Sequence, residues 1–204
     1  MSFCRLSKKQ ILSFSILRKI PFDLHDLFPG KYIYRAVIID GSVPHNSVSR
    51  IAFNPNPSYI SRANIKGQGI AYYACAFDIS IIEGCRDKLK SSNKREFELT
   101  VSKWKIKKKL SIQIICNSLK AQSSGTDLVD YYYATRTKNK SELPRRKYRT
   151  WFLKTRFFAE QYAKNIAKCE MDYIISATYA NTLLKSTDPL IDGIIYPSVQ
   201  YIFR

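Results

Sequence analysis

Hydrophobic and polar residues follow two different periods along the chain, and strand-like patterns dominate its first half. Residues 31–40 (KYIYRAVIID) are rich in aromatic and β-branched side chains and predict a strand. Residues 69–77 (GIAYYACAF) are apolar nearly throughout, which predicts a second strand that is buried on both faces. Apolar and polar residues alternate twice within residues 95–116, and lysines at 107–109 separate the two stretches, which predicts a hairpin with a basic turn. Residues 193–203 return to strand character.

Helices are predicted in three parts of the chain. Residues 1–30 are typical of a short leader helix that ends at a Pro-Gly pair. Asp78 can cap a helix that begins at Ile79, which places Glu83 in the first two turns. From Arg145 onward, apolar residues recur at helical spacing and indicate two core-facing stripes, first Tyr148, Trp151, Phe152, Phe158, Tyr162 and Ile166, then Tyr173, Ala177, Ala180 and Leu184. This order of strands, helices and one last strand predicts a single α+β domain.

The charge of the chain adds a class of partner to this picture. The 204 residues include 34 Lys or Arg and 16 Asp or Glu, which gives a formal net charge of +18. Such a surface attracts nucleic acid, an acidic protein, a phosphate-bearing small molecule or an anionic membrane. Much of the excess lies in residues 103–110 and 136–149, where Trp104 and Tyr148 stand among the basic residues. These runs are typical of single-stranded nucleic-acid binding, or of solvated surfaces with no ligand.

Cysteine usage and apolar runs bear on metal binding and location. The five cysteines are odd in number and scattered, without a C-x-x-C pair, and only two histidines accompany them. We therefore expect no metal site and no disulfide framework, but free and mostly buried thiols in a reducing compartment. The N-terminal residues lack the pattern of a signal peptide, and no run of eighteen apolar residues is present. A cytoplasmic protein is the expectation, with no membrane partner.

Polar residues in apolar settings are the candidates for chemistry. Arg35 interrupts the first strand, Arg62 and Asn64 precede a Gly-containing turn, Glu83 follows the second strand, and Ser198 follows a proline in the last strand. A guanidinium inside a strand needs an anion or several acceptors, because burying it without a partner is costly. One interpretation is a structural ion pair between Arg35 and Glu83. Two arginines and one glutamate nevertheless leave a positive surplus, which suits a pyrophosphate.

Two blocks of the chain, residues 34–83 and 173–198, resemble the RES domain family. The residues that carry the resemblance are YR in the first strand, RANIKGQGIAYYACAFDISIIE, and DYIISATYANTLLKSTDPLIDGIIYPS. The family is named for an Arg, a Glu and a Ser, which correspond here to Arg35, Glu83 and Ser198 as catalytic residues. The family usually has Gly where this chain has Ser61.

The resemblance implies that residues 31–204 form an NAD-binding catalytic domain with a mixed sheet, flanking helices and a fold similar to ADP-ribosyltransferases. It implies a toxin that depletes cellular NAD by cleaving the nicotinamide–ribose bond, either by hydrolysis or by phosphorolysis. It also implies an antitoxin partner, often with a helix-turn-helix DNA-binding domain, and the basic surface makes an acidic antitoxin the expectation. The alternatives are transfer of ADP-ribose to a protein target and a basic nucleic-acid-binding module.

The chemistry of this bond fits the candidate residues. Its cleavage develops an oxocarbenium-like cation on the ribose, which a carboxylate such as Glu83 would stabilise. Nicotinamide is already a cationic leaving group, so we expect neither a general acid nor a metal. The substrate-binding candidates are Arg35 and Arg62 at the pyrophosphate, Tyr72 or Tyr73 against the nicotinamide, Asn64 and Tyr34 elsewhere in the same block, and Ser198 as a hydrogen-bonding group. Strand alternation allows only one of Tyr72 and Tyr73 to face the site.

Overall fold

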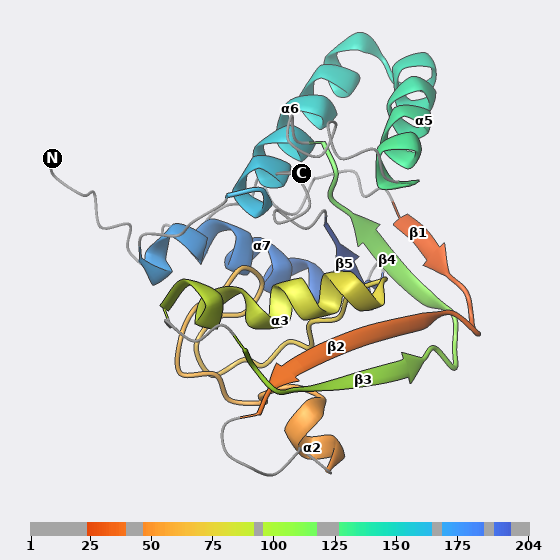
Figure 1. The fold of residues 1–204 in the computed structure, drawn as a ribbon. Coiled ribbons are helices and arrows are strands. Elements are labelled where there is room, and N and C mark those ends of the chain that lie inside the picture. The colour runs from red at the N-terminus through yellow and green to blue at the C-terminus, as the bar shows by residue number, and fades with distance from the viewer. Residues whose placement is uncertain are drawn as a thin grey trace, which may run out of the picture.

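The computed structural model describes residues 24–39, 47–91, 96–117, 127–164, 169–185 and 190–196. The predicted α+β class is confirmed, since helices and two small sheets occur together in one body (Figure 1). The strands are β1 (Leu24–Leu27), β2 (Tyr32–Ile38), β3 (Leu99–Lys105), β4 (Leu110–Ile114) and β5 (Gly193–Ile195). The helices are α2 (Val48–Ile51), α3 (Phe77–Ser91), α5 (Asp127–Glu142), α6 (Arg145–Tyr162) and α7 (Ile174–Leu184), with a 3₁₀ turn η2 (Glu170–Tyr173) before α7.

One long antiparallel ladder runs through both sheets and bends at a corner. In one sheet β2 pairs with β3, and in the other β1 pairs with β4. Leu27 lies opposite Leu110 and Tyr32 lies opposite Lys105, so four residues lie between the two pairs on each strand and the register is kept. Backbone bonds of Ile106 span the corner, to Gly30 at 3.0 Å and Lys31 at 2.9 Å. Strands that pass from one sheet to another at a bend join sheets in this way.

The first sheet is completed by β5, which lies parallel to β4. A parallel neighbour requires a long crossover, and α5, α6 and α7 provide it. The core under this sheet is formed by Ile115, Phe158, Ala159, Tyr162, Tyr179, Leu183 and Ile191. Phe158 of α6 stacks on Tyr179 of α7 with ring centroids 4.0 Å apart. The predicted core stripe is confirmed at Trp151, Phe158 and Tyr162, which are at most 6% exposed. Tyr148 and Phe152 are half-buried, and Ile166 lies outside the described residues.

Helix α3 covers one face of β2 at very close range. A Cβ on Gly84 would lie 2.8 Å from the carbonyl oxygen of Ala36 and 3.0 Å from its Cβ. Only glycine fits at this distance, so the position of Gly84 in the sequence determines where α3 crosses β2. Because Ala36 faces α3, strand alternation directs Arg35 to the opposite face of β2.

Several predicted elements are corrected by the structure. The last part of the predicted leader helix is wrong, because Leu24–Leu27 form strand β1, while residues 1–23 lie outside the described residues. The predicted hairpin over residues 95–116 is also wrong, because β3 and β4 pair in different sheets and the lysines at 107–109 mark the corner. Residues 69–77 make a single bridge, Tyr34 to Ala74, and alternate in exposure instead of being buried on both faces.

The free thiols are confirmed for the four described cysteines, although only Cys85 and Cys116 are buried and the other two are exposed. Cys4 lies outside the described residues. Within the described part of the chain, every helix is too short or too polar to span a bilayer.

Candidate functional site

Arg35 lies in the middle of β2, opposite Ser102 of β3. Its guanidinium is half-buried, and Nη1 donates to the carbonyl oxygen of Tyr72 at 3.0 Å. The Nε atom is buried and has no hydrogen-bond partner among the described residues. Burial lowers the pKa of this guanidinium, and nearby phenol groups act in the opposite direction. The side chain is therefore a partly dehydrated cation, and its buried Nε–H donor has no partner among the described residues.

The face of the β2–β3 pair that carries Arg35 also carries aromatic side chains. Ser102 donates its hydroxyl to the carbonyl oxygen of Arg35 at 3.1 Å, and Trp104 Nε1 donates to that hydroxyl at 2.8 Å. Tyr73 lies edge-on to Trp104 with ring centroids 5.8 Å apart. Burial raises the pKa of Tyr73 above its usual value, although the charge of Arg35 acts in the opposite direction. We call the surface formed by Arg35, Tyr73, Ser102 and Trp104 the Arg35 face.

Of the two adjacent tyrosines, Tyr73 is the one that shares this face with Arg35. Tyr72 turns the other way, into the loop of residues 61–64. Its hydroxyl lies 2.7 Å from the Ser61 hydroxyl, accepts from the backbone N–H of Ala63 at 2.8 Å and donates to Asn64 Oδ1 at 3.1 Å. Burial raises the pKa of Tyr72 despite these bonds. The neutral phenol therefore acts as a fixed tie between the loop and the strand-like segment that contacts β2.

Asn64 is 4% exposed and belongs to the same tie. Its Nδ2 donates to the carbonyl oxygen of Tyr59 at 3.1 Å, while Oδ1 accepts from the hydroxyls of Tyr72 and Ser61. Tyr72 thus connects the two residues, because its hydroxyl bonds to Asn64 at one end and its backbone carbonyl accepts from Arg35 at the other. The predicted residues Arg35, Asn64 and Tyr72 are thus brought together, with Asn64 as a support for the loop.

Arg62 is 7% exposed and points to the other half of the molecule. Its Nη1 donates to the carbonyl oxygen of Tyr162 at 2.7 Å, and Nη2 donates to that of Lys164 at 3.0 Å. Both acceptors lie at the C-terminal end of α6, where carbonyls lack helical partners and a cation is favoured. The rings of Tyr173 and Tyr196 flank the guanidinium at 5.7 and 5.8 Å. Arg62 therefore has a structural function that the sequence motif did not indicate.

Glu83 is half-buried in the second turn of α3, as predicted, next to the glycine that contacts Ala36. Glu83 and Arg35 thus come from two elements in direct contact. Helix α3 and the Arg35 side chain nevertheless lie on different sides of β2. The contacts of Arg35 do not support a structural ion pair with Glu83, because the Arg35 guanidinium donates its hydrogen bond to the carbonyl oxygen of Tyr72.

Tyr34 lies on the same side of β2 as α3. Its ring stands edge-on to Phe77, the first residue of that helix, with centroids 6.1 Å apart. Its backbone exchanges two 2.8 Å hydrogen bonds with Ala74, which attach the segment of residues 69–77 to β2. Ser198, the third residue of the motif, lies outside the described residues.

Sequence reasoning missed three participants in this region. The phenol of Tyr59 acts to raise the pKa of Arg35. Ser102 and Trp104 lie beside Arg35 and are connected to its carbonyl by hydrogen bonds. The signal for the last two was present, because residues two apart in a strand share a face. Tyr59 stands in a loop without periodicity, so only the fold could bring it to Arg35.

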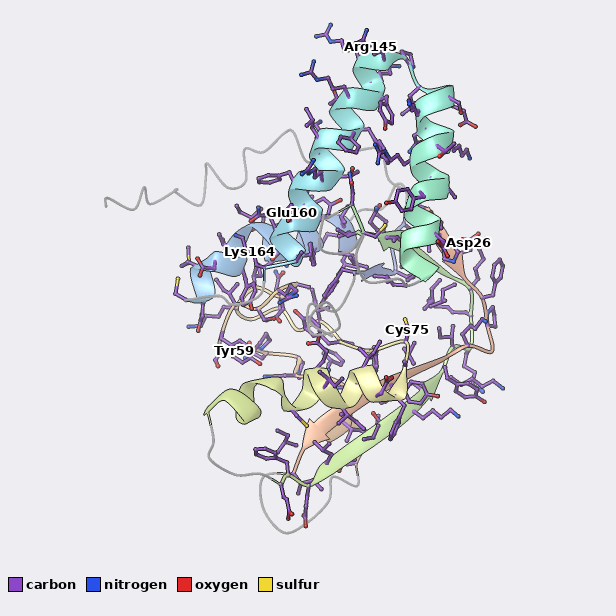
Figure 2. All side chains as sticks on the ribbon, turned by 45° about the horizontal axis from the view of Figure 1, so that its top comes forward. Asp26, Tyr59, Cys75, Arg145, Glu160 and Lys164 are labelled. Atoms are coloured by element: carbon purple, nitrogen blue, oxygen red, sulfur yellow. The ribbon has the colours of Figure 1, made fainter. Side chains whose placement is uncertain are left out.

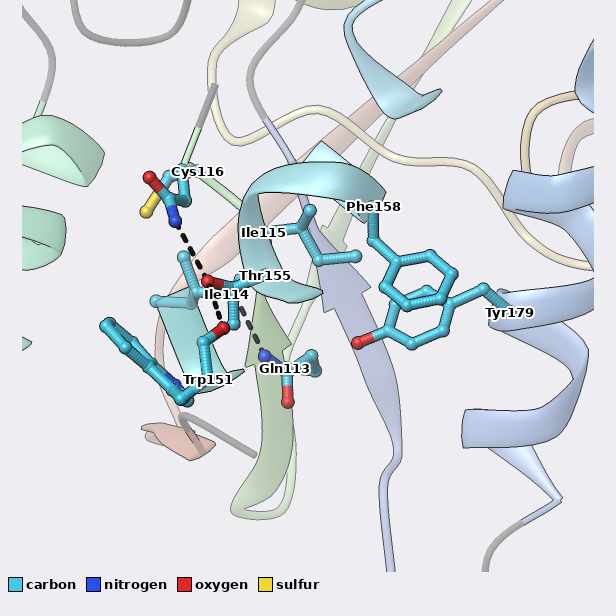
Figure 3. Close-up of a pocket in the computed structure, with 9 residues that line it drawn as sticks. Gln113, Ile114, Ile115, Cys116, Trp151, Thr155, Phe158 and Tyr179 are labelled. Atoms are coloured by element: carbon cyan, nitrogen blue, oxygen red, sulfur yellow. Dashed lines mark hydrogen bonds between the residues drawn. The ribbon is translucent and has the colours of Figure 1, made fainter. Parts of the chain in front are cut away.

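A small cavity between β4 and α6 lies away from these residues (Figure 3). It offers about 20 Å³ of space for the centre of a water molecule. Gln113 Oε1 and Trp151 Nε1, an acceptor and a donor, are buried at its wall without a hydrogen-bond partner among the described residues. This polar pair and the volume suit a buried water, but a nicotinamide would not fit.

The described residues contain no group of three or more His, Cys, Asp or Glu side chains that could hold a metal ion. No family model, curated protein or solved structure matches the chain.

Proposed function

We propose that this protein is an NAD-consuming enzyme of the RES type that cleaves the nicotinamide–ribose bond. The observation that carries the proposal is the half-buried guanidinium of Arg35, whose Nε has no partner among the described residues. A pyrophosphate supplies both the negative charge and the acceptor oxygens that such a group lacks. The RES motif around Arg35 and Glu83 adds support from the sequence.

The setting of Arg35 favours recognition of a rigidly placed anion. Its Nη1 is held by the carbonyl of Tyr72, and the hydroxyl of Tyr72 is held in turn by the loop of residues 61–64. An arginine fixed in this way loses little side-chain entropy when it binds phosphate oxygens. Tyr73 on the same face, 37% exposed, offers a ring for the nicotinamide or the adenine.

In this assignment Glu83 would act at the ribose that carries nicotinamide. The departing nicotinamide takes the electron pair of the N-glycosidic bond and becomes neutral, and positive charge develops on the ribose. The Glu83 carboxylate would stabilise that charge and accept a hydrogen bond from a ribose hydroxyl. Pyrophosphate and nicotinamide ribose are separate parts of one ligand, so Arg35 and Glu83 need not touch each other. Because α3 and the Arg35 side chain lie on different sides of β2, one NAD would have to pass the edge of this strand to reach both residues.

Other parts of the proposal follow from the family resemblance. Ser198 would hydrogen-bond the substrate, and Arg62 and Asn64 would keep the loop of residues 61–72 in place around it. Water or phosphate would accept the ADP-ribosyl group, and a protein side chain in that position would make the enzyme an ADP-ribosyltransferase. The fold would be of ADP-ribosyltransferase type, the location cytoplasmic, and the partner an acidic or DNA-binding antitoxin that silences the toxin.

The test is product analysis after incubation of the purified protein with NAD, with and without inorganic phosphate. Free nicotinamide is expected in both cases, together with ADP-ribose if water is the acceptor or its 1″-phosphate if phosphate is the acceptor. Arg35→Ala should weaken NAD binding by about tenfold or more, because a charge-assisted hydrogen bond contributes roughly 1.5–3 kcal/mol. Lys31→Ala is the matched control, since Lys31 is an exposed cation at the start of the same strand. Equal NAD binding by the two variants, or no nicotinamide release by the wild type, would reject the proposal.

A further inference from the structure

Helices α5 and α6 form a hairpin that stands out from the two sheets (Figure 1). Residues 136–156, around its closed end, contain nine Lys or Arg and one acidic residue. Six of the basic side chains are exposed and surround the turn, where Figure 2 shows Arg145. These six define what we call the hairpin tip: Lys138, Lys140, Arg145, Arg146, Lys147 and Arg149.

The charges of the hairpin tip have no partner in the part of the chain that the structure describes. None of its six side chains forms an ion pair or a ring contact with any residue in the described ranges. The other basic run, residues 103–110, differs in this respect. There Lys108 lies 4.0 Å from Asp192, Lys109 lies 2.8 Å from Asp26, and Lys103 lies 4.1 Å from the centre of the Tyr32 ring. Judged on the described residues, the six side chains of the tip are thus available to an external anion, whereas three lysines of the other run already have partners.

The four tip residues at the start of α6 conflict with the local preferences of a helix, whereas Lys138 and Lys140 lie at the C-terminal end of α5, where cations are favoured. The first turn of α6 contains no acidic residue, and its N-cap, Pro144, provides no side-chain hydrogen bond. Cations at this end meet the positive end of the helix dipole, and they also repel each other. Four cations that break the local rule at the start of α6, with no compensating partner among the described residues, indicate a function outside the fold.

The side chains of the tip favour a polyphosphate over a protein as the ligand. Protein interfaces have an apolar or aromatic centre. Among the described side chains of α5 and α6, the exposed large apolar residues are Tyr133, Leu153 and Phe157, all outside residues 138–149. Tyr148 does not offer a free ring for a base, since it is half-buried and stacks on Phe152 with centroids 6.1 Å apart. If the polyphosphate is a nucleic acid, the tip can therefore contact its backbone phosphates but not its bases, and phosphate contacts carry no sequence information.

We propose that the hairpin tip binds the phosphate backbone of nucleic acid without reading its sequence. The arginines of the tip would bind phosphate oxygens in a bidentate manner and the lysines as point charges. Each phosphate neutralised releases counterions, so the affinity should fall steeply as salt is added. This binding is independent of NAD cleavage and would hold a toxin near DNA or RNA whatever its catalytic activity.

The test compares two variants of equal net charge. In the tip variant, Arg145, Arg146, Lys147 and Arg149 are changed to Gln, and in the control variant the exposed lysines Lys66, Lys105, Lys107 and Lys108 are changed to Gln. Binding to a labelled duplex DNA, an oligo(dT) strand and poly-glutamate is measured by fluorescence anisotropy at several salt concentrations. Circular dichroism checks folding, and the tip variant should melt no earlier than the wild type because it removes cations from the start of α6.

Loss of four phosphate contacts should reduce the slope of log K against log salt by about 3.6 for the duplex. Between 50 and 200 mM salt the affinity of the wild type should accordingly fall about 150-fold more than that of the tip variant. The control variant should keep most of the wild-type slope, and duplexes of different sequence should bind equally. Identical slopes for the two variants would overturn the proposal. Tighter binding of the wild type to poly-glutamate than to either nucleic acid would also overturn it and assign the tip to an acidic protein.

Discussion

Truncating Arg62 separates its structural function from its predicted contact with substrate. Arg62→Ala removes two charge-assisted hydrogen bonds, of 2.7 and 3.0 Å, from the carbonyls at the end of α6. At roughly 1.5–3 kcal/mol for each bond, the free energy of unfolding should fall by about 3–6 kcal/mol. The contacts with the rings of Tyr173 and Tyr196 place the change toward the upper part of this range.

Arg35→Ala provides the comparison. Arg35 makes one such hydrogen bond, and its removal also relieves a buried nitrogen that has no partner among the described residues. We therefore expect a loss of only about 1–2 kcal/mol. Arg62→Lys should fall between the wild type and Arg62→Ala, because an ammonium keeps the charge but lacks the planar fork.

Urea denaturation followed by circular dichroism measures these differences, with thermal melting as a second observable. For a chain of this size 1 kcal/mol corresponds to about 2–4 °C, so Arg62→Ala should lower Tm by at least about 6 °C. Equal losses for Arg62→Ala and Arg35→Ala, or a loss below about 1 kcal/mol for Arg62→Ala, would refute the structural function assigned to Arg62.

Two further predictions concern the support of the site. Gly84→Ala should destabilise the protein by about 1–3 kcal/mol, because its methyl group would overlap the backbone of Ala36, and urea denaturation would show this. Burial raises the pKa of Tyr72 above its usual 10.0, so the stability that its neutral phenol contributes is present below pH 10 and is lost as the pH rises further. Tyr72→Phe should therefore be less stable near neutral pH by about 1–3 kcal/mol and less sensitive to alkali, whereas the exposed Tyr32→Phe should behave like the wild type.

The parts of the fold that could be predicted are those in which local pattern and tertiary contacts agree. The aromatic spacing of α6 matches its buried face, and the β-branched run of residues 32–38 becomes β2. The pairing of strands could not be read in this way. Residues 99–105 and 110–114 alternate as a hairpin would, but their partners lie about 60 to 90 residues earlier in the chain, and the ladder bends between them.

The candidate site shows the same division. The motif identified Arg35, Arg62, Asn64 and Tyr72 as special positions, and these are indeed buried or half-buried polar groups with specific partners. It could not show that Arg62 binds carbonyls at the end of α6, about 100 residues later, because the residues around an arginine do not indicate which distant helix end it contacts. The helical spacing that predicts α6 begins at Arg145, and the structure shows in addition that the earlier part of the basic run of residues 136–149 lies in the end of α5.

The most direct test of the proposed activity is the rate of nicotinamide release by Glu83→Gln. The change keeps the size of the side chain and removes the charge that would stabilise the ribosyl cation, so the rate should fall by about a hundred- to a thousandfold. Glu98→Gln, an exposed carboxylate just before β3, is the matched control and should keep the wild-type rate. Calorimetric titration should show that Glu83→Gln still binds NAD, and denaturation should show that it is folded. A folded Glu83→Gln protein that releases nicotinamide at the rate of the wild type would contradict the catalytic function assigned to Glu83.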